Sequence, residues 1–391
     1  MRKVYLCLAH MSGNEMKYIQ EAFDTNWVVP LGPNVNAFEE DLERFIGGGK
    51  KVVALASGTA AVHLGMIGLG VGKGDEIICQ SFTFAASCNP AIYLGATPVF
   101  VGSEEKTWNL DPNKLEDAIK DRIKVTGKKP KGIVPVYMYG MPAYIDEIME
   151  ISQRYEIPVL EDSAEAFGSL YKGKVVGTFG KYGIMSFNGN KMITTSGGGA
   201  LICPDEETKR QAMFYATQAR EDKPYYLHEK IGYNYRLSNV CAGIGRGQMT
   251  VANDHIRHHQ RIAKMYETAF ADNEIVRMHV APESYMEPNY WLSTITFETK
   301  ETNAPYIDEG NGIEPCEMVL KTMKALSEEG IESRPLWRPM HTQPVYKDAP
   351  SYVDGTCEKL FRKGLCLPSG PCVTDEDVER TINIIKKVVK Q

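Results

Sequence analysis

Residues 186–199 read SFNGNKMITTSGGG, and this stretch says more about the chain than any other. A short apolar run leads into an Asn/Gly turn, Lys191 follows, and three glycines precede a second apolar run. Glycine allows the backbone to approach a flat ligand closely, so Lys191 is a candidate amine for a binding site. A surface lysine in a β-hairpin is the competing interpretation, and this stretch alone does not separate the two.

Short apolar runs that are typical of buried strands fill the first 250 residues. They occupy residues 51–57, 75–81, 97–101, 131–140, 157–163, 182–188 and 198–204. Runs that are apolar on both faces indicate a mainly parallel sheet. Amphipathic helical patterns such as 112–124 and 146–156 alternate with them, which predicts an α/β fold with helices on both faces of the sheet.

The alternation weakens after residue 250. A long helix is expected over 254–270, then a mixed region with a strand near 291–299 and helices near 317–330 and 375–390. We therefore expect two domains, a large one over 1–250 that includes an N-terminal arm and a smaller α+β domain over 251–391.

Composition excludes several classes of protein. The net charge of -6 argues against a basic face for nucleic acid. No window approaches the roughly 20 apolar residues of a membrane span. The nine cysteines lack CxxC pairs and metal-ligand spacing, as expected for reduced thiols. We expect a cytoplasmic enzyme without a nucleic-acid or membrane partner.

Glu161 and Asp162 end the apolar strand expected within residues 157–163. Open α/β sheets bind ligands at the carboxyl ends of their strands, so Asp162 should point toward a ligand. A buried carboxylate there can pair with a pyridinium nitrogen and keep it protonated, which makes the ring an electron sink. Helix capping is the competing interpretation for Asp162.

Ser57, Gly58 and Thr59 follow the first strand and open a helix. Small residues at a helix N-terminus leave backbone N–H groups and the positive end of the helix dipole free for a phosphate. The signal is weak alone, because Ser and Thr cap many helices. The glycines at 68–74 follow this helix instead of opening it, so we reject a P-loop or a dinucleotide motif.

These residues, taken with other ordered segments, make the chain similar to the DegT-type nucleotide-sugar aminotransferases. The similar segments are 14–42, 56–64, 81–87, 95–101, 161–169, 186–201, 232–239, 334–346 and 365–370. The resemblance implies the fold type I architecture of pyridoxal-5'-phosphate (PLP) enzymes, PLP as cofactor, a nucleotide sugar and L-glutamate as substrates, and a homodimer with shared active sites.

The resemblance also implies roles for individual residues. Lys191 would hold PLP as a Schiff base and move protons, Asp162 would pair with the pyridine nitrogen, and Phe84 would stack on the ring. The other residues expected to bind the cofactor are Ser57, Gly58, Thr59, Glu165 and Ser186, with Asn234 of the partner subunit reaching the phosphate.

Two positions depart from the family pattern. Many members have Gln near the cofactor O3' where this chain has Glu165, and a glutamate there would have to be protonated or otherwise compensated. Gly102 stands where the usual pattern has an aspartate. We assign no consequence to Gly102.

Lysine at position 191 distinguishes aminotransferases from the sugar dehydratases of the same family, which have histidine there. An amine can form and release an imine and also move a proton, whereas imidazole can do only the proton step. The segments 217–221, 232–240 and 334–343 resemble, in particular, the 4-aminotransferases that make UDP-4-amino-4,6-dideoxy-N-acetyl-α-D-glucosamine for bacillosamine. GDP-perosamine synthases and dTDP-sugar aminotransferases are the alternatives.

The segment 334–343 contains three candidate substrate-binding residues. Arg334, Trp337 and His341 suit a diphosphate and a sugar face. A packed loop with an incidental cation is the alternative interpretation.

A zinc site and a non-catalytic PLP-binding regulator are the two rival interpretations. His255, His258 and His259 have the spacing of zinc ligands on a helix, but no Cys or carboxylate pattern completes a tetrahedral set, so we expect no metal. A non-catalytic PLP-binding regulator would normally carry a DNA-binding domain, and no helix-turn-helix segment precedes this one.

Overall fold

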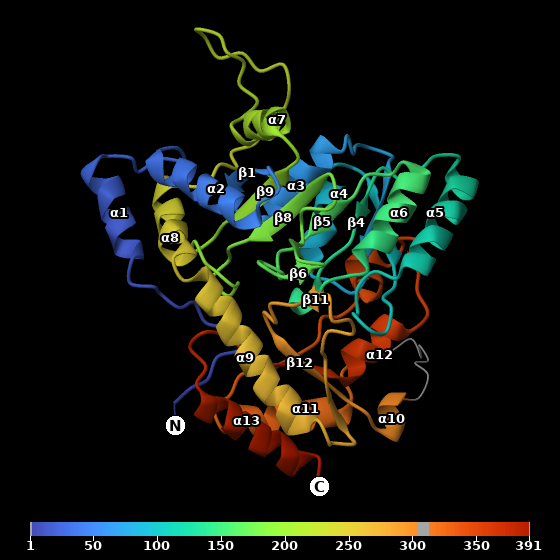
Figure 1. The fold of residues 1–391 in the computed structure, drawn as a ribbon. Helices are drawn as coiled ribbons and strands as arrows, with labels where there is room; N and C mark the ends of the chain where they lie inside the picture. The colour runs from blue at the N-terminus through green and yellow to red at the C-terminus, as the bar shows by residue number, and fades with distance from the viewer. Residues whose placement is uncertain (1, 304–312, 391) are drawn as a thin grey trace.

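The computed structural model describes residues 2–303 and 313–390 (Figure 1). Its strands are β1 Lys51–Leu55, β2 Glu76–Gln80, β3 Thr97–Val101, β4 Ile133–Val134, β5 Leu160–Asp162, β6 Leu170–Tyr171, β7 Lys174–Val175, β8 Tyr182–Ser186, β9 Gly199–Cys203, β10 Val276–Met278, β11 Met286–Glu287, β12 Ser293–Phe297, β13 Arg334–Pro335, β14 Ser351–Tyr352 and β15 Gly364–Leu367. Its helices are α1 Glu15–Asp24, α2 Pro33–Ile46, α3 Gly58–Gly68, α4 Asn89–Tyr93, α5 Pro112–Thr126, α6 Ile145–Tyr155, α7 Glu206–Ala216, α8 Asn239–Met249, α9 Ala252–Phe270, α10 Lys300–Asn303, α11 Glu317–Glu328, α12 Thr356–Lys363 and α13 Asp375–Val388.

Two four-stranded sheets form the centre of the fold, with strand orders β14-β3-β2-β4 and β1-β9-β8-β5. Parallel bridges from Ile133 to Val159 and from Val136 to Asp162 connect them. Each of the seven expected strand runs contains a strand, and most neighbours are parallel. The exception is β9, which runs antiparallel to both β1 and β8. The connection between β8 and β9 contains no helix to cross the sheet, and this connection carries Lys191.

Helices cover both faces of this sheet, as the alternation of strands and helices predicted. Along β1, Val52 and Ala54 pack into the same core as Phe38 of α2. Val53 and Leu55 point to the other face, into the core that contains α3. Successive side chains of a strand face opposite ways, so one short apolar run serves two cores.

A separate antiparallel sheet, β10-β12-β15-β13, forms from residues after 270. It shares a core with α9, α11 and α13, through residues such as Ile262, Val319 and Ile382. In Figure 1, α9 runs from the central sheet toward this second sheet. Later residues also return to earlier strands, because β14 pairs with β3 and β11 with β6. The division into domains at residue 250 stays a prediction.

A helix that spans a membrane must be both long and apolar. Within the part of the chain that the structure describes, no helix has both the length and the apolar character needed to span a bilayer.

Candidate active site

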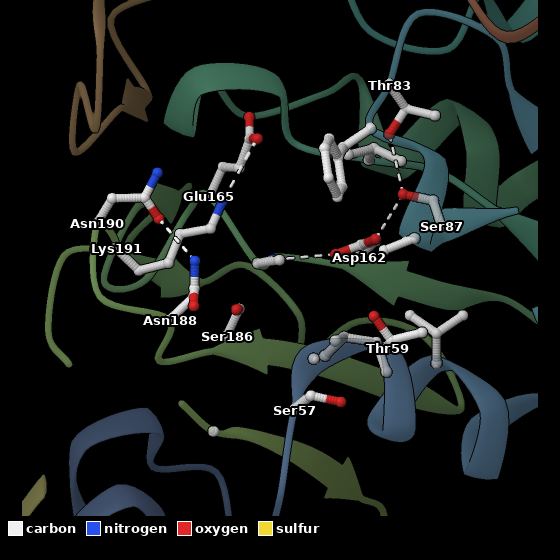
Figure 2. Close-up of a pocket in the computed structure, with 18 of the residues that line it drawn as sticks. Ser57, Thr59, Thr83, Ser87, Asp162, Glu165, Ser186, Asn188, Asn190 and Lys191 are labelled. Atoms are coloured by element: carbon white, nitrogen blue, oxygen red, sulfur yellow. Dashed lines mark hydrogen bonds and ion pairs between the residues drawn. The ribbon is translucent and has the colours of Figure 1, made fainter. Parts of the chain in front are cut away.

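A cavity of about 320 Å³ opens where β5 and β8 end and α3 begins (Figure 2). Asp162 is the last residue of β5 and Ser186 the last residue of β8. The predicted site residues that line the cavity are Ser57, Gly58, Thr59, Phe84, Asp162, Glu165, Ser186, Lys191 and Trp337. The fold thus brings together residues that are far apart in the sequence, from Ser57 to Trp337.

Lys191 lies in the connection between two antiparallel strands, but it is not a surface lysine. Its side chain is 15% exposed. The Nζ atom lies 3.7 Å from the centre of the Trp291 ring and 3.5 Å from Oε1 of Glu165. The Trp291 indole donates a 2.6 Å hydrogen bond to the carbonyl of Asn190, which ties the ring to the lysine segment. A partly desolvated amine over an aromatic face is thereby held inside the cavity.

Asp162 is buried beside two hydroxyl groups. Its Oδ2 accepts a 2.7 Å hydrogen bond from Ser87, whose hydroxyl also lies 2.9 Å from that of Thr83 (Figure 2). Its Oδ1 accepts from the N–H of Ala164 at 3.1 Å. Burial raises the pKa of Asp162, and the two hydrogen bonds and the charge of Lys191 act against that rise. The carboxylate is therefore desolvated yet supported in its ionised form.

The first turn of α3 forms an anion-binding end of the cavity. Ser57 caps the helix by accepting a 3.0 Å hydrogen bond from the N–H of Ala60. The N–H groups of Gly58 and Thr59 belong to a turn that offers them no intrahelical acceptor. A Cβ on Gly58 would stand 3.1 Å from Cβ of Ser186, and a Cβ on Gly199 would stand 2.4 Å from the nitrogen of Gly58. Gly199 is therefore required for the strand to pass this close to the helix terminus, and a side chain at position 58 would crowd Ser186.

This donor set fits PLP. An amine, a buried carboxylate and a helix N-terminus with hydroxyl groups face one cavity, and these are the partners that an aldehyde, a pyridine nitrogen and a phosphate require. Phe84, which is 62% exposed, lies at the same cavity, where an aromatic ring could cover a planar ligand.

Glu165 is compensated by donors. Its Oε2 accepts a 2.8 Å hydrogen bond from the N–H of Tyr139, and its Oε1 accepts from the indole N–H of Trp337 at 3.2 Å. The Lys191 amine is its third neighbour. The departure from the usual Gln therefore leaves no uncompensated charge at this position.

Three predicted site residues are not among those that line the cavity. Asn234 is exposed and pairs with Thr217 in an antiparallel bridge. Arg334 is exposed and lies 3.1 Å from the carboxylate of Glu332. Their predicted roles in cofactor and substrate binding stay predictions.

His341, the third of these, is held between two polar side chains. Its Nδ1 lies 2.6 Å from Oγ of Ser81, and its Nε2 lies 2.9 Å from Oε1 of Glu358. Both ring nitrogens are engaged within the protein, so contact with a substrate, which the sequence predicted, would require one of these bonds to open. That role also stays a prediction.

Several lining residues were missed by the sequence analysis. They are Thr83, Ser87, Asn188, Asn190 and Trp291. The first four lie inside segments that were already singled out, so their polar side chains were a usable signal. Trp291 precedes β12 in a distant part of the chain, and no local pattern connects it with Lys191.

The chain matches one family profile and several known proteins along nearly its whole length. A sequence profile described as the DegT/DnrJ/EryC1/StrS aminotransferase family matches residues 9–386. EpsN of Bacillus subtilis (strain 168), provisionally named a pyridoxal phosphate-dependent aminotransferase, is 45% identical over 389 residues, which cover 98% of this chain and 95% of EpsN. A GDP-perosamine synthase of Caulobacter vibrioides is 33% identical, with 99% of this chain and 98% of that protein covered.

Solved structures of aminotransferases superpose on nearly the whole chain. A DegT DnrJ EryC1 StrS aminotransferase from Brucella abortus superposes with a TM-score of 0.86 at 27% identity, covering 96% of this chain and 95% of that one. DesV of S. venezuelae, solved with a ketimine intermediate, gives 0.84 at 25% identity, with 97% and 95% covered. The aminotransferase PseC of Helicobacter pylori gives 0.87 at 22% identity with both chains fully covered, a likeness of fold.

Proposed function

This chain belongs to the DegT/DnrJ/EryC1/StrS aminotransferase family, and from that premise we propose that it transfers the amino group of L-glutamate to a UDP-4-keto-6-deoxy-N-acetylhexosamine. It is a PLP-dependent transaminase with the fold type I architecture. The proposal adds the substrates, the product, a 4-amino sugar nucleotide for glycan synthesis, and the roles of the residues in the cavity.

The residues that would hold PLP follow from the geometry of the cavity. The first turn of α3 and Ser186 would bind the phosphate, Asp162 the ring nitrogen, and Lys191 the aldehyde carbon. Bound PLP supplies a protonated ring that stabilises negative charge on the carbon next to the transferred nitrogen. Asp162 keeps that proton in place because its own charge is buried and supported by Ser87 and Ala164.

Lys191 would then move the proton. Within residues 2–303 and 313–390, its Nζ makes no hydrogen bond shorter than the 3.5 Å contact with Glu165, so the amine can exchange partners. The Trp291 ring covers one face of the amine and limits the access of water to it. The observation that carries the proposal is that the Lys191 amine and the Asp162 carboxylate open onto one cavity together with the N-terminus of α3.

The assignment of the nucleotide and of the sugar rests on sequence similarity. The segments 217–221, 232–240 and 334–343 resemble 4-aminotransferases that act on the UDP sugar. The 33% identity to a GDP-perosamine synthase favours a GDP-4-keto-6-deoxy sugar as the second candidate. We propose the cytoplasm as the compartment, because all nine cysteines are free thiols, as a reducing compartment keeps them.

One assay separates these candidates. Purified protein loaded with PLP is incubated with L-glutamate and, in turn, UDP-, GDP- and dTDP-4-keto-6-deoxy sugars, and the 4-amino products are detected by mass spectrometry. We expect the highest kcat/KM with the UDP-N-acetylhexosamine. A higher value with the GDP sugar would replace the substrate assignment, and no product with any sugar would overturn the proposal.

A further inference from the structure

Helix α9 carries three histidines, His255, His258 and His259, that the proposed reaction leaves without a role. In residues 2–303 and 313–390, no group of three or more His, Cys, Asp and Glu side chains could hold a metal ion. The contacts of His255 and His259 lead instead to the backbone of Met192, which follows Lys191, and of Tyr290, which precedes Trp291.

His255 bonds to the residue that follows the lysine. Its Nδ1 lies 3.0 Å from the carbonyl oxygen of Met192. A carbonyl only accepts, so Nδ1 of His255 carries the proton. Its Nε2 is then an acceptor, and His10 donates to it from its own Nδ1 at 3.2 Å. Burial lowers the pKa of His255, so the ring stays neutral and keeps one N–H for Met192.

His259 lies one turn further along the same face. Its Nδ1 lies 3.1 Å from the carbonyl oxygen of Tyr290, a residue whose φ of 50° is in the left-handed region. Trp291 follows directly, and its ring lies under the Lys191 amine. Burial lowers the pKa of His259 to about 3, so this ring is also a neutral donor. Its Nε2 is buried and has no hydrogen-bond partner among the described residues, so the polar contacts of His259 are with the backbone of Tyr290 and Trp291.

We propose that His255 and His259 are positioning residues that fix the Lys191 amine from both sides. One hydrogen bond holds the chain next to the lysine at Met192, and the other holds Tyr290 in the conformation that places Trp291 against the amine. Both hydrogen bonds come from helix α9, so the distance between the Met192 and Tyr290 segments is fixed. This inference rests on the proposed role of Lys191.

The geometry provides a matched set of variants. Asn carries its amide nitrogen on Cγ, as histidine carries Nδ1, so His255→Asn and His259→Asn can keep the bond to the carbonyl. Gln places its nitrogen one atom further out, like Nε2, and Leu has no donor. His258 is the control on the same helix, because it contacts the backbone of Gly370 instead.

The experiment measures how the lysine holds PLP. Each holoenzyme is reduced with borohydride, the fraction of PLP fixed on Lys191 is read by peptide mapping, and the rate of PLP release after dilution is followed by absorbance. A buried carbonyl without its donor costs enough to shift an equilibrium by about tenfold. We therefore expect His255→Leu and His259→Leu to release PLP about tenfold faster, with less label on Lys191. The Asn variants and His258→Leu should stay within about twofold of the wild type.

Thermal unfolding of every variant separates positioning from stability. If a Leu variant does not fold, the Gln variant takes its place, since it stays polar but places its nitrogen beyond the position of Nδ1 that faces the carbonyl. Leu or Gln variants that release PLP as slowly as the wild type would overturn the inference, as would Asn variants that behave like Leu. If borohydride labels no Lys191 in the wild type itself, the proposed function fails, and that result is independent of the variants.

Discussion

The carboxylate of Glu165 lies 3.5 Å from the amine of Lys191, and its other two neighbours, the N–H of Tyr139 and the indole N–H of Trp337, are also donors. An ionised carboxylate has acceptor sites on both oxygens, whereas an amide has an acceptor on one side and two N–H donors on the other. The position is therefore arranged for glutamate in this chain, where the family resemblance predicted Gln.

Glu165→Gln is expected to destabilise the protein. The amide oxygen can accept from Tyr139 or from Trp337, and the amide nitrogen then faces the other donor inside a site where Glu165 is only 5% exposed. We expect a loss of about 1–3 kcal/mol in the free energy of unfolding, measured by urea denaturation of the PLP-free protein. The exposed Glu105→Gln is the control and should be neutral. Equal stability of Glu165→Gln and wild type would show that the amide is accommodated.

Ser87→Ala tests the support of Asp162. The Ser87 hydrogen bond favours the charged carboxylate against the burial that raises its pKa, so its loss raises the pKa of Asp162 further. Asp162 then becomes protonated at higher pH, and the acid limb of the kcat/KM profile should move to higher pH. Thr83→Val keeps the bond from Ser87 to Asp162 and should move the limb less. An acid limb that stays in place in Ser87→Ala would argue against ionised Asp162 as the required form.

The sequence predicted site residues where a chemically suitable residue type stands at the end of a recognisable strand. Lys191 and Asp162 were found because each ends or follows an apolar run, and the ends of neighbouring strands must meet at one edge of a sheet. The sequence did not predict that β9 runs antiparallel to its neighbours. An apolar run of this length indicates a buried strand but not the direction of that strand relative to the adjacent strands.

Contacts between distant segments account for what was missed. Trp291 reaches Lys191 because α9 and the backbone before β12 pack beside the lysine segment, and no local spacing records that packing. His341 has the residue type of a ligand-binding group, but its two partners, Ser81 and Glu358, come from separate elements. Residue type indicates what a side chain can do, and only the tertiary fold determines which partner it meets.

His279 should make stability depend on pH. Its ring stacks on Trp108 at 3.6 Å, its Nε2 contacts the carbonyl of Lys106, and burial lowers its pKa from 6.5 to about 3. Below pH 6.5 the unfolded chain binds a proton that the folded chain excludes, so stability falls with falling pH down to about pH 3.

The matched variant is His279→Gln, which removes the titrating group. Between pH 6 and pH 5, the wild type should lose about 1 kcal/mol more of its free energy of unfolding than the variant does. Urea denaturation at several pH values measures both. Parallel pH dependences of the two proteins would mean that His279 accepts its proton in the folded state.

Asn234 remains a predicted ligand of the cofactor in the partner subunit, and its place in the fold is compatible with that role. It is exposed, and it lies outside the lining of the cavity that contains Lys191 of the same chain. The loop that leads to it projects from the rest of the chain after α7 (Figure 1). Hydrogen bonds from the N–H groups of Tyr233 and Tyr235 to the end of α7 fix its base, so Asn234 is presented on ordered backbone.

Mixing an inactive variant with an impaired one tests this arrangement. Lys191→Ala lacks the amine, and Asn234→Ala should lose PLP at least about tenfold faster if its amide binds the phosphate across the dimer. When the two are unfolded and refolded together in equal amounts, half of the dimers are hybrids, and one of the two sites in each hybrid receives both intact residues. The mixture should then recover about one quarter of the wild-type activity per subunit, while each variant refolded alone recovers far less. If Asn234 acts only within its own chain, the hybrid contains no intact site, and activity stays at the level of the separate variants even when native mass spectrometry demonstrates the heterodimer.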